Sequence, residues 1–381
     1  MKYKMISICL LVMFFLPGGI CVYMQEQKTT EPFEKIIYPE LLIDTHKGDT
    51  DENYILYEPS AVTTDSAGNI YIINSRMNQI SKFDSSGKFI KKWGTAGAAP
   101  GEFQFTGPGD ALTVGSGGLL YVVDRGQARV QIFNLDGKYL DGFRVEAGDW
   151  PDSIVVAKNG DIYLSVPPVN SLKKRYTIHL YKKSKNGYEF VKGFADSQVW
   201  LDDDDLTQKE SGAVSYSGMS FLASDSNNNI YQVFMYLPII RKFNPSGEML
   251  WQKTIDISTL SQMRGSHITY YENEMEPQKV DKKNLAAFAK KIFSLGVAIS
   301  KQNENIYVFH TQKYSILELS LDGNLLGAYY PCDILLATEE DVRKSTTTGK
   351  LWLYFNFTLN METNKAFFVG LITGELWVSR L

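Results

Sequence analysis

One short pattern returns five times along this chain and limits its fold more than any other feature. Each copy places a tyrosine inside an apolar run, in most copies after Asn-Ile or Asp-Ile. The copies are NIYII (69–73), LLYVV (119–123), DIYLS (161–165), NIYQV (229–233) and NIYVF (305–309). Aromatic and β-branched residues suit pleated strands, so the pattern predicts one strand of a repeated all-β unit.

Each unit continues in the same way after its tyrosine. A second apolar-polar element follows, as in ISKF (80–83) and VQIF (130–133), and then a turn glycine and a third alternating run. The glycines are Gly87, Gly137, Gly187, Gly247 and Gly323. A further strand precedes each tyrosine, as in PSAVTTD (59–65). Four short strands per unit predict the blades of a β-propeller, which must stack in a ring to bury both faces.

The C-terminus holds a sixth, incomplete unit. KAFFV (365–369) places Phe367 where the tyrosine stands elsewhere, and residues 378–381 align with 80–83. This unit ends one strand short, whereas EKIIYPELLI (34–43) has no unit of its own. We therefore predict a six-bladed β-propeller with four-stranded blades over residues 30–381, its ring closed when the N-terminal strand completes the last blade.

The second unit resembles an NHL repeat. The resemblance rests on GGLLYVV followed by DRGQARVQIFNLDGKYL, with close agreement over residues 117–137. Agreement is fair over 68–87, where Asn74 replaces the aspartate and Gln79 the arginine of the pattern, and weaker in the other units. The resemblance implies a six-bladed propeller of the bacterial secreted type and a loop held by Asp124 and Arg129. It implies no single activity.

Residues 1–24 differ from the rest of the chain. MKYK is basic, and MISICLLVMFFL is an apolar run that is short for a membrane span of about 20 residues. The pattern predicts a signal peptide, and hence export to the periplasm, the cell surface or the medium. An uncleaved anchor and lipid attachment through Cys21 are the alternatives for membrane attachment, and Ile20 before Cys21 argues against the second. Cys332 would then be alone in the mature domain, without a disulfide partner.

Composition and motifs argue against several functions. The formal net charge of −4 gives no basic face for a nucleic-acid partner. The four histidines form no HExxH motif, and the chain has no G-x-S-x-G elbow and no P-loop. We therefore predict no catalytic residues and no cofactor from motifs, with a bound calcium ion as the alternative considered below.

Two long connections separate the later units. They cover residues 195–217, with DDDD at 202–205, and 256–295, where Asp281 and Gly296 would bound a helix over 281–296. Both join an outer strand to the next inner strand, so both should lie on one face, where long loops commonly build binding sites. The acidic run reads as a solvated loop. The ligand-contact candidates on this face are Arg125, Trp150, Tyr216, Tyr270 and Tyr271. The alternatives are a solvated cap without a ligand and, for the four aromatic residues, packing under the long loops, which is somewhat favoured.

A ring of small or polar residues is predicted at the central channel. Counting back eleven residues from each anchor gives Ser60, Asp110, Asp152, Ser220, Gly296 and Asn356. Asp110, Asp152 and Asn356 offer the oxygen ligands that calcium or magnesium prefers. Gluconolactonase-like lactonases hold a divalent metal at a comparable place, but this chain lacks their full acid and amide set. Small polar residues in a narrow, wet channel are the simpler reading.

The sequence thus favours an exported propeller that binds a protein, peptide or glycan at its loop-bearing face without catalysis. The alternative is a divalent-metal-dependent hydrolase or lyase of gluconolactonase-like type, with its site at the axis. Ligand identity and oligomeric state are left open by the sequence.

Overall fold

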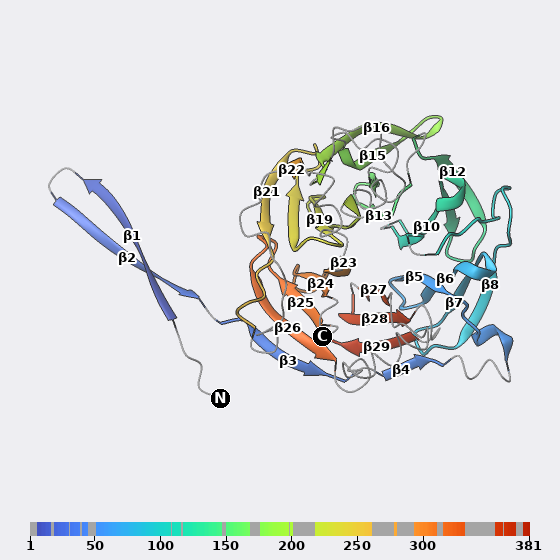
Figure 1. The fold of residues 1–381 in the computed structure, drawn as a ribbon, viewed down its shortest axis with the longest axis horizontal. Helices are drawn as coiled ribbons and strands as arrows, with labels where there is room; N and C mark the ends of the chain where they lie inside the picture. Colours follow the sequence, from blue (N-terminus) through green and yellow to red (C-terminus); the bar gives the residue numbers. More distant parts are fainter. Residues whose placement is uncertain are drawn as a thin grey trace.

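In the computed structural model the chain forms six sheets arranged as the blades of a ring (Figure 1). Each has four antiparallel strands, and one of them carries a fifth strand. The structure describes residues 6–16, 19–29, 31–38, 40–44, 51–107, 109–115, 117–146, 150–167, 176–197, 199–200, 218–260, 278–279, 293–310, 315–331, 355–360, 362–370 and 376–381. Three short 3₁₀ turns connect strands of the blades, with η2 at Glu52–Tyr54, η3 at Ser75–Met77 and η4 at Arg125–Gln127.

The blades follow one another along the chain. Blade 1 contains β5 (Pro59–Thr64), β6 (Ile70–Asn74), β7 (Gln79–Phe83) and β8 (Phe89–Trp93). Blade 2 contains β9 (Ala111–Val114), β10 (Leu119–Asp124), β11 (Arg129–Asn134) and β12 (Tyr139–Arg144). Blade 3 contains β13 (Ser153–Val156), β14 (Ile162–Ser165), β15 (Tyr176–Ser184) and β16 (Gly187–Asp196).

The second half of the ring repeats this order. Blade 4 contains β18 (Ser220–Ser224), β19 (Ile230–Phe234), β20 (Ile239–Phe243) and β21 (Met249–Thr254). Blade 5 contains β23 (Ser294–Ile299), β24 (Ile306–His310), β25 (Ser315–Leu319) and β26 (Leu325–Pro331). Blade 6 contains β27 (Phe355–Asn360), β28 (Lys365–Gly370) and β29 (Leu376–Arg380) from the C-terminus.

The first strand of each blade lies innermost and contacts the first strand of the next blade. The contacts run from β5 through β9, β13, β18 and β23 to β27, and β27 contacts β5 again. The ring is therefore closed, and the prediction of six blades is confirmed.

Ring closure uses two N-terminal strands instead of the single strand predicted at 34–43. β4 (Glu40–Ile43) pairs antiparallel with β29 and completes blade 6 as predicted. β3 (Phe33–Ile37) instead pairs parallel with β26 as a fifth strand of blade 5. Pro39 separates the two segments, and proline has no N–H to donate to a continuous ladder. The N-terminal segment therefore joins blade 5 to blade 6 (Figure 1).

Two other sequence expectations need correction. Residues 294–296 belong to β23, so the helix expected over 281–296 does not reach Gly296; its remaining residues lie outside the described part. The last strand is also shifted by two positions from its expected alignment. Tyr71 pairs with Lys82, and Phe367 pairs with Val378, so Val378 corresponds to Lys82 and not to Ile80. Cross-strand pairing, which local sequence similarity does not report, decides this register.

The repeated tyrosine closes a turn in addition to filling the core. In blade 1, Asp65 accepts hydrogen bonds from the backbone N–H of Asn69 (2.9 Å) and from the hydroxyl of Tyr71 (2.9 Å). Asp225 does the same for Asn229 (2.8 Å) and Tyr231 (3.0 Å) in blade 4. An aspartate side chain that caps its own turn favours a tight connection between the first two strands.

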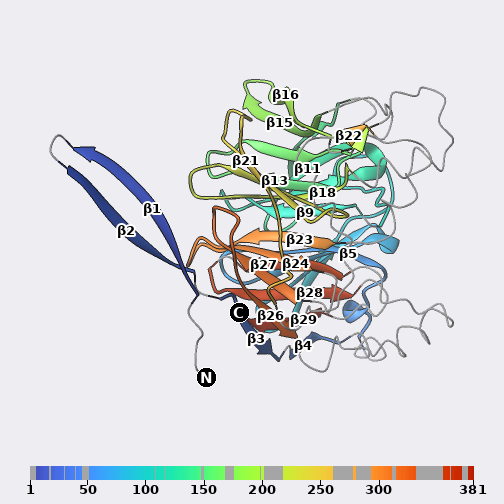
Figure 2. The same ribbon diagram turned by 60° about the vertical axis from the view of Figure 1, so that its left-hand side comes forward.

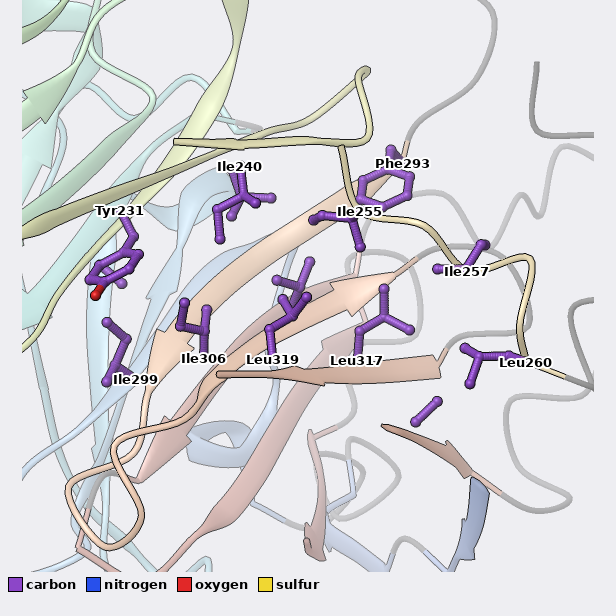
Figure 3. Close-up of a cluster of buried hydrophobic side chains, with 14 of the residues drawn as sticks. Tyr231, Ile240, Ile255, Ile257, Leu260, Phe293, Ile299, Ile306, Leu317 and Leu319 are labelled. Carbon is purple, nitrogen blue, oxygen red and sulfur yellow. The ribbon is translucent and has the colours of Figure 1, made fainter. Parts of the chain in front are cut away.

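Hydrophobic side chains fill the spaces between neighbouring blades. Figure 3 shows one such cluster, in which Tyr231 and Ile240 of blade 4 lie with Ile306 and Leu317 of blade 5. Ile255, Ile257 and Leu260, from the connection after β21, belong to the same cluster. Each interblade layer is therefore a small core that neither blade could bury alone.

The turn glycines of the outer hairpins permit this close interblade approach. Gly137 has a φ of +77°, and a Cβ added there would lie 2.6 Å from the Trp93 ring of the preceding blade. Gly323 has a φ of +75°, and a Cβ added there would lie 2.8 Å from the Trp251 ring of the preceding blade. Glycine is thus required at these turns both for its left-handed conformation and for its lack of a side chain.

Gly137→Ala is expected to lower the free energy of unfolding by about 2–4 kcal/mol, from left-handed strain and from overpacking against Trp93. Gly160→Ala is the matched control, because Gly160 also has a positive φ (+87°) but nothing lies within 4 Å of the added Cβ. That control should lose only about 1 kcal/mol. Urea unfolding measures both values; equal losses would show that the Trp93 contact does not require glycine.

A β-bulge recurs between the third and outer strands of all six blades. The register shifts at Lys82/Phe83, Ile132/Phe133, Leu180/Tyr181, Lys242/Phe243, Glu318/Leu319 and Leu376/Trp377. A bulge increases the local right-handed twist of a strand pair. The irregularity also occurs where β4, which comes from the N-terminus, pairs with β29.

The N-terminal residues form a separate antiparallel hairpin of β1 (Ile6–Leu16) and β2 (Gly19–Thr29). It projects away from the ring (Figure 2). Among the residues that the structure describes, no helix has the length and apolar character needed to cross a bilayer. The signal or anchor assigned to residues 1–24 remains a prediction.

Candidate functional site at the channel mouth

The candidate site lies where the innermost strands of blades 2 and 3 begin. Asp110 directly precedes β9, and Asp152 directly precedes β13. Arg125 begins η4, the connection between β10 and β11. In an up-and-down blade, the start of the first strand and the connection between the second and third strands lie at the same edge. These three residues therefore share one face of the ring, called here the loop-bearing face.

Both long insertions also leave the blades on this face. Val199 and Trp200 form β17 in the first insertion, and Gln278 and Lys279 form β22 in the second. The two strands pair in parallel, with Val199 opposite Gln278, so the insertions meet each other as expected for a shared face. Tyr216, Tyr270, Tyr271 and the acidic run at 202–205 lie outside the described residues.

Arg125 contacts two other candidate residues, Asp152 and Trp150. Its Nη2 atom lies 3.1 Å from Oδ1 of Asp152, whose side chain is buried, and the Arg125 side chain is 12% exposed. Its guanidinium also lies over the ring of Trp150, 5.5 Å from the ring centroid. Trp150 itself is 48% exposed. The Asp152–Arg125 pair therefore supports a half-exposed aromatic ring at the surface, where guanidinium-aromatic contact is favourable.

Asp110 is held by its own loop. The backbone N–H groups of Thr106 (2.9 Å) and Gly107 (2.7 Å) donate to its carboxylate. The Ser75 hydroxyl from blade 1 lies 3.3 Å from Oδ2 of Asp110 and 2.6 Å from the Ser60 hydroxyl. Asp110 thus connects the first strands of blades 1 and 2.

Gly109 and Ser75 belong to the candidate site but were not predicted from the sequence. Gly109 has a φ of +105°, and a Cβ there would lie 2.3 Å from Nη1 of Arg125. Any larger residue would therefore displace the guanidinium. Ser75 aligns with Arg125 at the start of the equivalent 3₁₀ turn, so comparing the η3 and η4 positions between units could have found it.

Both carboxyl groups are shifted toward their neutral forms. Burial raises the pKa of Asp152 from its ordinary value of 3.8 to about 7, and the nearby Arg125 charge only partly opposes this. Burial likewise raises the pKa of Asp110 to about 7, against hydrogen bonds from Gly107 and Thr106 and the charge of Arg125. Carboxyl groups with a pKa near neutrality are concentrated at functional sites.

The raised pKa of Asp152 predicts a pH-dependent stability. Because the folded state holds the proton more tightly, this group favours folding at low pH. Its contribution declines by up to about 1.4 kcal/mol per pH unit as pH rises between the ordinary and raised pKa values. Asp152→Asn should therefore gain stability relative to wild type between pH 5 and pH 8, measured by thermal unfolding. A stability difference between Asp152→Asn and wild type that stays constant with pH would contradict this prediction. Asp136→Asn, at an exposed turn, is the control.

The metal hypothesis gains little from these contacts. The described residues contain no group of three or more His, Cys, Asp or Glu side chains placed to hold a metal ion. The Asp152 carboxylate faces a guanidinium, which a divalent cation would have to displace. Asn356 lies in β27 as expected, but its side chain is outside the described part, and Gly296 lies within β23. Calcium binding through Asp110, Asp152 and Asn356 stays a prediction.

The Asp124–Arg129 pair has the structural role implied by the NHL resemblance. Nε of Arg129 donates to Oδ2 of Asp124 at 2.8 Å, and the Gln104 N–H donates to Oδ1 at 2.8 Å. Arg129 also donates to the backbone carbonyls of Ala98 (2.6 Å) and Glu102 (2.8 Å). The pair therefore anchors the connection that precedes β9.

Comparison with known proteins supports the fold. Residues 48–192 match a family model described as a 6-bladed beta-propeller. A catalytically inactive virginiamycin B lyase from Staphylococcus aureus with quinupristin is similar at a TM-score of 0.50 and 11% identity, covering 91% of this chain and 99% of that one. A gluconolactonase from Xanthomonas campestris is similar at 0.50 and 14% identity, covering 91% and 89%.

A luciferin-regenerating enzyme is also similar, at a TM-score of 0.50 and 10% identity, covering 90% of this chain and 95% of that one. At identities this low, the structural similarity supports the propeller fold alone and does not indicate an activity. The comparisons do not name the NHL repeat, so that finer assignment stays a prediction.

Proposed function

We propose that this protein is an exported binding protein that holds a protein, peptide or glycan partner at its loop-bearing face without catalysing a reaction. One observation carries the proposal: the half-exposed Trp150 ring is supported from behind by Arg125, which is itself held by the buried Asp152. A large aromatic side chain fixed before its partner arrives loses little conformational entropy on binding. Tryptophan and arginine are also the residues that most often dominate binding energy.

The expected partner contact can be tested with a surface variant. Trp150→Ala should weaken capture of the native partner from the envelope fraction by about tenfold or more, in the range of a binding hot spot. Leu140→Ala is the matched control, because Leu140 is 47% exposed on the outer strand of the neighbouring blade and lies away from this face. Equal capture by the wild-type protein and Trp150→Ala would reject the proposed surface.

The second candidate is a divalent-metal-dependent hydrolase or lyase acting at the channel mouth. The raised pKa values of Asp110 and Asp152, both about 7, favour it because a general acid or base works best near the operating pH. The two candidates differ in their response to chelation. A binding protein should keep its partner after EDTA treatment, whereas the enzyme should lose turnover and regain it with calcium or magnesium.

A further inference from the structure

We infer that the outer hairpin of blade 3, formed by β15 and β16, docks on a bilayer surface that contains anionic phospholipids. The tip of this hairpin lies on the side of the ring opposite the loop-bearing face, called here the turn face. The turn face carries the connections between the first and second strands, and those between the third and outer strands of blades 1 to 5. It is separate from the proposed binding site at Trp150.

The hairpin of blade 3 is longer than those of blades 1, 2, 4 and 5. β15 has 9 residues and β16 has 10, whereas the corresponding strands of those four blades have between 5 and 7. In the four shorter hairpins the register ends at the β-bulge, as at Phe83 opposite Phe89. In blade 3 it continues past the bulge to Ser184 opposite Gly187. The tip therefore extends beyond the other turns of this face.

The extension is basic in an acidic chain. Residues 182–192, KKSKNGYEFVK, hold four lysines and one glutamate, a formal charge of plus three, whereas the whole chain carries −4. Lys182 is paired with Asp161 at 3.1 Å. Lys183 and Lys185 are exposed near the tip, and neither forms an ion pair with a carboxylate of the described residues. Their charges are therefore open to an external anion.

Packing against blade 2 fixes the hairpin before any partner arrives. The Tyr188 ring lies 5.4 Å from the Phe143 ring of blade 2, and the Nζ atom of Lys183 lies 5.9 Å from the centroid of the Tyr188 ring. A hairpin held in this way loses little conformational entropy on docking. Phe190 and Val191, which are 38% and 49% exposed, add apolar surface beside the lysines.

The N-terminal segment leaves the ring at the same face. β3 pairs in parallel with β26, with Phe33 opposite Gly327. Because β26 follows a turn of the turn face, β3 also begins there, and the residues before Phe33 leave from that side. The β1–β2 hairpin, whose first strand is the apolar ISICLLVMFFL, projects from the ring there (Figure 2). An apolar segment held in a bilayer would thus bring the turn face to the lipid surface.

A lipid surface matches these features together. Basic side chains are attracted to anionic headgroups, and adjoining apolar side chains can enter the boundary between headgroups and acyl chains. One short apolar segment binds a bilayer weakly, so a second contact on the same face increases the total affinity. Docking in this orientation directs the loop-bearing face, with Trp150, away from the bilayer and toward a partner.

The experiment measures sedimentation of the full chain with two kinds of vesicle, phosphatidylcholine alone or equal parts of phosphatidylcholine and phosphatidylglycerol. We expect the wild type to bind the anionic vesicles about tenfold or more tightly, and added salt to reduce this preference. Lys183→Gln/Lys185→Gln should remove most of it. Arg76→Gln/Arg144→Gln, which removes two exposed cations from the loop-bearing face, is the matched control and should keep the preference.

Binding to phosphatidylcholine alone reports the apolar N-terminal segment and should be equal in all three proteins. The inference is overturned if the wild type binds both kinds of vesicle equally, if Lys183→Gln/Lys185→Gln keeps the preference, or if the control variant loses it as well. It is also overturned if polygalacturonate or polyglutamate, and not the anionic vesicle, is bound through the two lysines. All four substituted positions are exposed, so the variants should fold.

Discussion

Deletion of residues 29–45 is expected to lower the melting temperature by more than about 10 °C, because it removes the strand that closes the ring. β4 is the outer strand of blade 6, and its loss would expose the edge of β29. It would also remove Ile43, which is fully buried in a cluster containing Phe83 of blade 1 and Leu376 of blade 6. The measurement is thermal unfolding followed by circular dichroism.

Two point variants in β4 test its contribution to ring closure without deleting the N-terminal segment. Ile43→Ala should cost about 2–5 kcal/mol, the usual range for removing a fully buried aliphatic side chain. Leu41→Ala, in the same strand but 40% exposed, should cost much less. If the deletion leaves the melting temperature unchanged, or if the two point variants lose equal stability, β4 does not close the ring in solution.

The Asp124→Asn substitution is expected to cost about 3–5 kcal/mol of stability, the range for breaking a buried ion pair. Asp124 is fully buried and accepts hydrogen bonds from Gln104, Arg129 and Gln131. An asparagine would lose the charge opposite Arg129 and could not accept from all of these donors with both side-chain atoms. The free energy of unfolding in guanidinium chloride measures the loss.

Asp136→Asn is the control for this second prediction. Asp136 lies in the same blade, but its side chain is 81% exposed and its carboxylate is 3.5 Å from the Nζ atom of Lys82. Because the Asp136 carboxylate is solvated, its pairing with Lys82 should contribute no more than about 1 kcal/mol. Losses of similar size in both variants would show that the buried network at Asp124 does not hold the connection before β9.

The strand repeat was predictable because each blade is a local structure. The anchor tyrosines, the turn glycines and the alternating runs lie within one blade, so their spacing reports short-range pairing. Tyr71 and Tyr231 occupy equivalent places and close equivalent turns with Asp65 and Asp225. The pairing of Asp124 with Arg129 was predictable for the same reason, since both residues bound one connection.

The candidate site was predictable only in part. Asp110 and Asp152 were correctly expected at the starts of innermost strands, since that position repeats in every unit. The contact of Arg125 with Asp152 and Trp150 was not predicted, because it forms between blades 2 and 3. No periodicity within a blade reports which side chains of neighbouring blades meet. The requirement for glycine at position 109 follows from that interblade contact as well.

Sequence alone therefore determined the repeating unit of this protein: four strands, a turn glycine, six copies and one missing strand at the end. Only the tertiary structure decided that the N-terminal segment divides between two blades, with β3 on blade 5 and β4 on blade 6. Only the tertiary structure, likewise, showed that Arg125 forms an ion pair with Asp152. The physical reason is that strand and turn preferences act over a few residues, whereas ring closure and interblade contacts depend on surfaces that exist only once the blades have stacked.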